Sequence, residues 1–171
     1  MSPIDCSSRS SPTASDTDVL VRLARPDEAE LVFAIMREAF AEYDGKLPQP
    51  SGALRETVED VRRAMAEGGA ALAFIGETGV GSARYLLEAD ALYVGRVAVL
   101  PGYRRRGIAS ALMAFMEQHA REMGLTRVHI GVRESLPSNL ALYESLGYER
   151  VNVEPHGADR SWTMIKPLSG Q

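Results

Sequence analysis

Cysteine, histidine and long apolar runs are scarce in this chain of 171 residues. The single cysteine, Cys6, has no partner in the chain, which excludes an intrachain disulfide and a multi-cysteine metal site. No run approaches the roughly 18 apolar residues of a membrane-spanning helix, and the N-terminus lacks the apolar core of a secretory signal. We therefore expect no membrane segment, and a reducing cytoplasm as the compartment.

An excess of positive charge is also absent. Lys and Arg total 19 against 23 Asp and Glu, a formal net charge of −4. Because proteins that bind nucleic acid usually present a basic face, this balance argues against a nucleic-acid partner. The three histidines are scattered and match no carboxylate spacing, so we expect no metal site.

What is present fits one globular domain preceded by a tail. Residues 1–17 are rich in Ser, Thr, Pro and Asp, and we expect them to be disordered, whereas residues 18–171 form the domain. Periodicity and turn residues predict the order βααβββαβαββ. The predicted strands begin at 19, 71, 80, 91, 127, 148 and 161, and the predicted helices cover 27–43, 56–67, a long segment after 103, and 137–146.

The most informative segment is GRVAVLPGYRRRGIASALM, which runs from Gly95 to Met113 and joins a strand to the long helix. We expect this helix to begin with the run Arg104 to Arg106, where cations are unfavourable because the helix dipole is already positive. A bound anion would compensate. Backbone amides at the helix start can donate to a pyrophosphate, and Gly107 and Ala109 are small enough to allow its approach. The alternative is an exposed basic turn.

This segment resembles motif A of the GCN5-related N-acetyltransferase (GNAT) superfamily, Gln/Arg-x-x-Gly-x-Gly/Ala directly after a strand. The resemblance extends over about residues 19–168. It implies an α/β fold in which four helices flank a mixed central sheet of about seven strands, with a bulge near Gly95, and acetyl-coenzyme A as co-substrate. The residues that it implies for cofactor binding are Val97, Ala98, Val99, Arg104, Arg105, Arg106, Gly107, Ile108 and Ala109.

A second resemblance lies between Asn139 and Tyr148, which is similar to the family's motif B. There a helical tyrosine stands near the thioester sulfur, which implies that Tyr143 is the general acid. A phenol with a reference pKa near 10 is protonated at neutral pH and can donate to a departing thiolate. The alternative is a tyrosine that packs under the sheet. The family's usual asparagine falls at Leu136 here, so Asn139 is either a weak cofactor contact or a helix cap.

The general base is not assigned by the sequence. An amine must lose a proton before it attacks a carbonyl carbon, yet the positions at which branches of the family carry a glutamate hold Tyr93 and Gly131. Each remaining candidate has the alternative of a solvated or structurally paired side chain. These candidates are Glu42, Asp44, Glu88, Asp90, His129 and Glu134.

The acceptor side of the family corresponds to about residues 40–61. Its acidic and aromatic side chains, Glu42, Tyr43, Asp44 and Glu56 among them, could attract a cationic amine, or could belong to a mobile polar lid. We expect direct transfer of an acetyl group to the amine of a small molecule or peptide. The sequence is also compatible with a homodimer. The alternatives are a non-catalytic sensor of acyl-coenzyme A and a phosphate clamp for nucleic acid.

Overall fold

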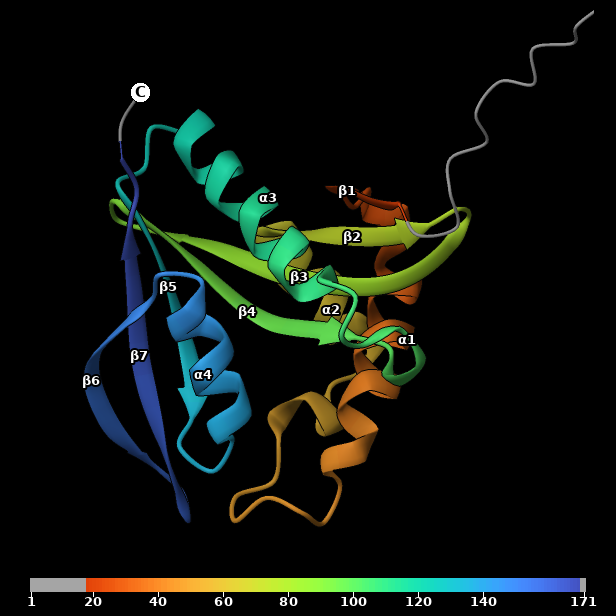
Figure 1. The fold of residues 1–171 in the computed structure, drawn as a ribbon. Helices are drawn as coiled ribbons and strands as arrows, with labels where there is room; N and C mark the ends of the chain where they lie inside the picture. Colours follow the sequence, from red (N-terminus) through yellow and green to blue (C-terminus); the bar gives the residue numbers. More distant parts are fainter. Residues whose placement is uncertain (1–17, 170–171) are drawn as a thin grey trace, which may run out of the picture.

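The computed structural model describes residues 18–169, so the predicted tail and Cys6 lie outside the described residues. Strands and helices follow the predicted order, and the sheet is mixed, as expected (Figure 1). The elements are β1 (Val19–Leu23), α1 (Ala29–Phe40), α2 (Val58–Glu67), β2 (Gly69–Ile75), β3 (Thr78–Glu88), β4 (Ala91–Val99), α3 (Ile108–Glu122), β5 (Arg127–Arg133), α4 (Pro137–Ser145), β6 (Glu149–His156) and β7 (Asp159–Pro167).

Local signals explain where the helices begin and end. Thr57 and Asp60 form a capping box at the start of α2, in which the Asp60 amide donates to the Thr57 hydroxyl over 3.2 Å and the Thr57 amide donates to the Asp60 carboxylate over 2.8 Å. Gly124, which follows the C-cap residue Met123 of α3, is left-handed with a φ of 75°. These positions could be read from the sequence because each cap lies within a few residues of the helix that it ends.

Near the centre of the sheet, two neighbouring strands separate along part of their length. The strand order is β1-β2-β3-β4-β5-β7-β6, and β4 and β5 form its parallel pair. They pair only from Ala91 to Val94 on β4 and from Arg127 to Ile130 on β5, and then diverge (Figure 1). The far end of β4, from Val97 to Val99, therefore has backbone groups that β5 does not reach.

Two apolar cores lie on opposite faces of the sheet. On one face α1 and α2 bury Val32, Met36 and Val61 against Leu72 of β2. On the other face α3 and α4 cover the sheet, and Leu112 is among the residues buried there (Figure 1). Each such side chain contributes about 1.5–3 kcal/mol through burial. The point at which β4 and β5 diverge therefore lies between two packed layers of helices.

A bulge distorts β4 just before the opening, as the resemblance predicted. The register changes between Ser82, which pairs with Ala98, and Arg84, which pairs with Gly95. The left-handed residue is Arg96, with a φ of 51°. A non-glycine residue in this conformation costs about 1–3 kcal/mol and persists only where its surroundings hold it. The contacts of the Arg96 side chain supply that restraint, as described below.

Candidate active site

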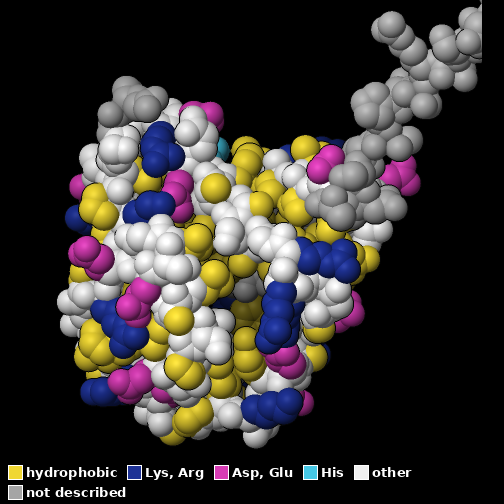
Figure 2. Space-filling view, viewed as in Figure 1, with side chains coloured by type: hydrophobic (Ala, Val, Ile, Leu, Met, Phe, Trp, Pro, Cys, Tyr) yellow, Lys and Arg dark blue, Asp and Glu magenta, His cyan; other side chains and the backbone are white. Residues whose placement is uncertain are grey.

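A cavity of about 590 Å³ lies where β4 and β5 diverge, and Figure 2 shows a hollow in the middle of this face. Its walls come from the end of α1 and the turn after it, the end of β4, the loop into α3 with that helix's first turn, and α4. All predicted site residues except Arg106 line it, namely Val97, Ala98, Val99, Arg104, Arg105, Gly107, Ile108, Ala109, Asn139 and Tyr143.

The start of α3 differs from the prediction. We expected the helix to begin at Arg104, but it begins at Ile108, because Gly107 is left-handed with a φ of 75° and separates the helix from the preceding loop. The arginines therefore lie ahead of the helix rather than on its first turn. No side chain caps the helix, and a Cβ atom on Gly107 would meet no atom within 4 Å. The first amides of α3 thus face open space beside the cavity.

The three arginines before α3 have different environments. Arg104 forms an ion pair with Glu42 and donates to the carbonyl oxygens of Ala39, over 3.2 Å, and Val99, over 3.3 Å. It therefore ties α1 to the end of β4. Arg105 lines the cavity and is exposed, whereas the Arg106 guanidinium lies 5.3 Å from the centre of the Tyr103 ring.

Tyr143 both packs against the core and lines the cavity. Its ring packs edge-on against Tyr148, with ring centres 5.9 Å apart, while the residue also lines the cavity. Only 8% of Tyr143 is exposed. Burial, followed by the proximity of Tyr43 and Tyr93, raises the pKa of its hydroxyl well above the usual value of 10. The hydroxyl therefore stays protonated at neutral pH and can donate a proton.

Asn139 does not cap α4, so that alternative is wrong. Leu136 is the N-cap and Pro137 the first helical residue, which places Asn139 in the first turn. Its side chain lies near the hydroxyl of Tyr43, whose pKa is raised by burial and by Glu42. This contact brings α4 close to the turn after α1. Leu136, Pro137, Asn139, Tyr43 and Glu42 all line the same cavity.

Among the six base candidates, only Glu42 lines the cavity. The Asp90 carboxylate lies 3.2 Å from Arg127, and Asp44 is exposed. The Glu134 carboxylate accepts two bonds from Arg160, each 2.7 Å long.

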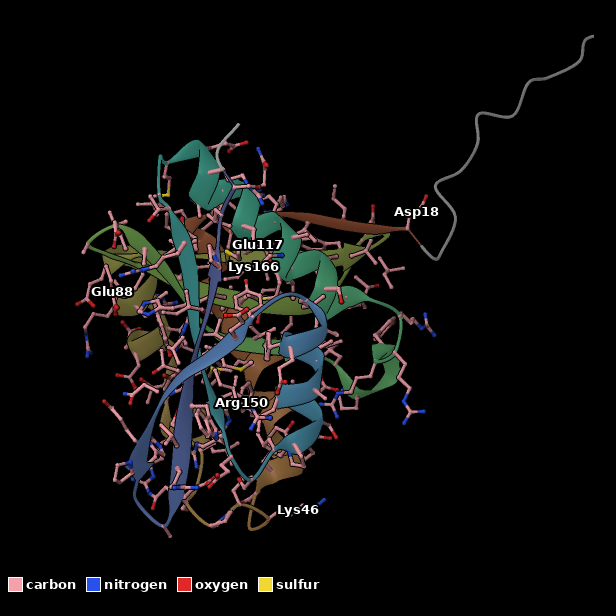
Figure 3. All side chains as sticks on the ribbon, turned by 60° about the vertical axis from the view of Figure 1, so that its left-hand side comes forward. Asp18, Lys46, Glu88, Glu117, Arg150 and Lys166 are labelled. Atoms are coloured by element: carbon pink, nitrogen blue, oxygen red, sulfur yellow. The ribbon has the colours of Figure 1, made fainter. Side chains whose placement is uncertain are left out.

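His129 and Glu88 lie on the other side of the β4–β5 pair from the α3 core. The His129 Nε2 atom is 2.9 Å from a carboxylate oxygen of Glu88, and its ring centre is 5.2 Å from that of Tyr93. Figure 3 shows Glu88 far from Lys46, which belongs to the loop after α1. This His–Glu pair is thus separated from the acceptor-side loop.

Two glycines make room for Tyr93, an arrangement that sequence reasoning missed. A Cβ atom on Gly95 would lie 3.0 Å from the Tyr93 ring, and one on Gly131 would lie 3.8 Å from its hydroxyl. The Tyr93 side chain therefore fills the space that side chains at positions 95 and 131 would need. The sequence shows the two glycines, but the pairing of the strands determines which side chain packs over them.

Two of the acidic side chains considered for the acceptor side are paired with arginines. Glu42 is paired with Arg104. Glu56 accepts bonds of 2.7 and 2.8 Å from Arg84 and of 3.2 and 3.3 Å from Arg96. These arginines come from distant parts of the chain, so the local sequence around Glu42 and Glu56 does not predict the ion pairs.

A clasp holds the loop between α1 and α2 against the far end of the sheet. Arg133 donates to the carbonyl oxygens of Gln49, over 2.6 Å, and Pro50, over 3.2 Å. The Ala158 amide, in the turn between β6 and β7, donates to the Gln49 side chain over 3.2 Å. Lys46, in the same loop, lies at the end of the molecule where β6 and β7 meet (Figure 3). The loop is thus anchored rather than free.

Within residues 18–169, no helix is long and apolar enough to cross a membrane. The same residues contain no group of three or more His, Cys, Asp or Glu side chains placed to hold a metal ion.

Comparison with known proteins agrees with this geometry. The chain is 34% identical over 65 residues to YjgM of Escherichia coli K12, an uncharacterised N-acetyltransferase, and the match covers 38% of this chain and 39% of the relative. The matched segment is thus less than two thirds of the relative's length.

Solved structures match more of the chain. The ribosomal-protein-S18-alanine N-acetyltransferase of Escherichia coli superposes with a TM-score of 0.75 at 19% identity, covering 90% of this chain and 96% of that one. The PaiA N-acetyltransferase of Thermoplasma acidophilum, solved with coenzyme A, has a TM-score of 0.74 at 16% identity, covering 88% and 99%. At these identities the likeness establishes the fold.

A family model described as "Acetyltransferase (GNAT) family" matches residues 29–148, which is more than half of the chain and includes every segment that lines the cavity. The predicted superfamily and fold are confirmed. Acetyl-coenzyme A is the co-substrate of this family. The chain belongs to the acetyltransferase (GNAT) family.

Proposed function

We propose that this protein transfers the acetyl group of acetyl-coenzyme A to an amine by direct attack within a ternary complex. The observation that carries this proposal is one cavity that contains the uncapped start of α3, the unpaired end of β4, and a buried tyrosine whose pKa is raised. The first feature suits a diphosphate, the second an extended amide-containing arm, and the third a leaving thiolate.

Backbone groups would make most of the contacts to the cofactor in its half of the cavity. The free amides of the first turn of α3 donate to the diphosphate, and the absence of a side chain on Gly107 lets it approach. The exposed Arg105 and Arg106 add positive charge nearby. Between Val97 and Val99, the groups of β4 that β5 does not reach can pair with the pantetheine amides. Asn139 is a weaker cofactor contact, because its side chain is shared with Tyr43.

The chemical step needs one proton donor and one proton acceptor. The amine nitrogen bonds to the acetyl carbon, the carbon–sulfur bond breaks, and Tyr143 gives its proton to the sulfur. The proton lost by the amine passes to water, since the one candidate carboxylate on the cavity, Glu42, already accepts from Arg104. A positioned acid of this kind contributes about 10²–10⁴ in rate.

Two measurements test the proposal. Calorimetry of the purified protein should give a one-to-one complex with acetyl-coenzyme A, and a panel of amines should accelerate release of free coenzyme A above the buffer rate. Failure to bind acetyl-coenzyme A would overturn it. Binding without release for every amine would instead support the alternative of a non-catalytic acyl-coenzyme A sensor.

A further inference from the structure

A half-buried cluster of charges lies on the acceptor side of the β4 bulge. The Glu56 carboxylate is bound by both guanidinium nitrogens of Arg84, at 2.7 and 2.8 Å, and more loosely by Arg96, at 3.2 and 3.3 Å. The side chains of Arg84 and Glu56 are 13% and 18% exposed, whereas that of Arg96 is 33% exposed. The outer member of the cluster is therefore Arg96.

The cluster carries one positive charge in excess, since two guanidinium groups face one carboxylate. Burial alone would raise the pKa of the Glu56 carboxyl, but the arginines hold it below its usual range, so Glu56 is ionised at neutral pH. Nearby, Glu59 is paired with Arg62. Asp60 is bound to Thr57, lies 3.6 Å from Arg63 and interacts with Arg84 over a longer distance. A bidentate pair of Arg84 with Glu56 is complete without Arg96.

The cluster adjoins the proposed reaction site. Arg84 pairs across the strands with Gly95, and such neighbours lie about 5 Å apart. The Tyr93 hydroxyl lies over Gly95, 3.2 Å from where its Cβ would be. Tyr93 is in turn close enough to Tyr143 to affect its pKa. Glu56, Arg84 and Arg96 do not line the cavity, but Gly95 and Tyr93 lie between this cluster and Tyr143.

The backbone around Arg96 keeps its side chain in this place. Its left-handed conformation is one that only a strong restraint maintains in a non-glycine residue. Gly52, in the loop that leads to α2, lets that loop pass close to the guanidinium, because a Cβ there would lie 3.0 Å from Arg96 Nη2. The guanidinium is thus held beside the site while part of it stays accessible.

We propose that the acceptor carries a carboxylate close to its reacting amine, as a free amino acid does, and that Arg96 binds this carboxylate. The proposal rests on the acetyl transfer proposed above. A guanidinium matches a carboxylate with two parallel donors, and the excess charge of the cluster is neutralised when such an acceptor binds. Arg96 then selects the acceptor, whereas Arg84 and Glu56 form a pair that is complete without it.

The test compares matched acceptors on the full chain. Release of coenzyme A is measured at saturating acetyl-coenzyme A with common L-amino acids and with the corresponding amino-acid amides. We expect kcat/KM for the acids to exceed that for the amides by about tenfold or more, the worth of one charge-assisted hydrogen bond. The amide has the less basic amine, so intrinsic reactivity favours the amide and cannot produce this preference.

Three variants separate acceptor binding from a purely structural role. Arg96→Gln should bring the acid-to-amide ratio close to one. Arg160→Gln, which removes an arginine of a surface pair with Glu134, should leave the ratio unchanged. Glu56→Gln frees Arg96 from its protein partner, so the ratio should hold or rise even though the melting temperature falls.

Several results would overturn the inference. Amides that react as well as the acids would do so, as would equal loss of the ratio in Arg96→Gln and Glu56→Gln. Absence of release with every pair, in a protein that binds acetyl-coenzyme A, would also overturn it while leaving the cofactor site intact. Absence of acetyl-coenzyme A binding would instead remove the proposed function, and this inference with it.

Discussion

The two walls of the cavity are built in different ways. The cofactor wall, from Val97 to Ala109, is one continuous stretch of chain that offers backbone amides and a glycine. The acceptor side depends on side chains that meet across long sequence distances. Glu42 and Arg104, 62 residues apart, line the cavity, whereas Glu56 and Arg96, 40 residues apart, pair outside its lining. The backbone geometry of the first wall fixes which ligand groups it can bind. The ligand specificity of the second wall can change through substitution of a single charged side chain.

This difference predicts where substitutions act. Changes on the cofactor wall should alter affinity for acetyl-coenzyme A, because its binding groups cannot be replaced by neighbouring side chains. Changes on the acceptor wall should alter acceptor affinity and loop stability while leaving cofactor affinity nearly intact.

The largest effect is expected for Gly107→Glu. The new carboxylate would stand at the uncapped start of α3, in the space now open for a diphosphate, and the residue would have to adopt a φ of 75°. Repulsion, bulk and backbone strain act together, so we expect affinity for acetyl-coenzyme A to fall by about 10³-fold or more. Calorimetry measures this loss directly.

The matched controls separate charge from strain. Gly102→Glu places the same charge in the preceding turn, where a Cβ meets nothing within 4 Å and no left-handed backbone is required. It should bind nearly as the wild type does. Gly107→Ala tests strain without charge and should lose much less affinity. Equal losses in Gly102→Glu and Gly107→Glu would mean that only net charge matters.

Tyr143→Phe should reduce kcat by about 10²-fold with little change in affinity for acetyl-coenzyme A, because it removes a proton donor and keeps the packed ring. Steady-state kinetics with the best amine of the panel, together with calorimetry, measure both quantities. Tyr103→Phe, which alters another cavity-lining tyrosine, is the control and should retain kcat. A loss of cofactor binding as large as the loss of kcat would contradict the role of Tyr143.

The pH dependence sharpens this assignment. Since the pKa of Tyr143 is raised, its protonated, donating form persists to higher pH than that of a free phenol. We expect no decline of kcat assignable to this residue below about pH 10. A pH–rate profile of the wild type checks this, and an alkaline decline near pH 8 that disappears in Tyr143→Phe would contradict it.

The sequence predicted the fold and the segment that borders the cavity, because both depend on local signals. Strand and helix periods, caps and the turn before Gly107 are properties of short segments, so the element order and the lining residues could be predicted. The start of α3 was misplaced because a left-handed glycine between the loop and the helix reads locally like part of the helix. The ion pairs of the acceptor wall join residues that become neighbours only when the sheet forms, so their charges were taken as free.

Arg133→Gln tests the clasp on the loop between α1 and α2. It removes donors to the carbonyl oxygens of Gln49 and Pro50 and a charge 3.7 Å from the nearly buried Asp159. We expect a loss of about 1–3 kcal/mol, which lowers the melting temperature by several degrees. KM for the acceptor should rise more than the dissociation constant of acetyl-coenzyme A. Arg160→Gln is the control, and equal changes in both constants would mean that the clasp supports the whole cavity.

The smallest effect concerns the acid stability of the acceptor wall. The pKa of Glu56 is lowered in the folded state, so its ion pairs stabilise the protein above the unfolded value of about 4.3 and this stabilisation is lost as pH falls through the folded pKa. Glu56→Gln has no such charge to lose. Melting temperatures of the wild type and this variant should therefore differ at pH 6, and the difference should disappear only when the pH falls below the lowered folded-state pKa of Glu56. A difference that stays constant over this range would show that hydrogen bonds and packing, rather than the charge of Glu56, hold the acceptor wall together.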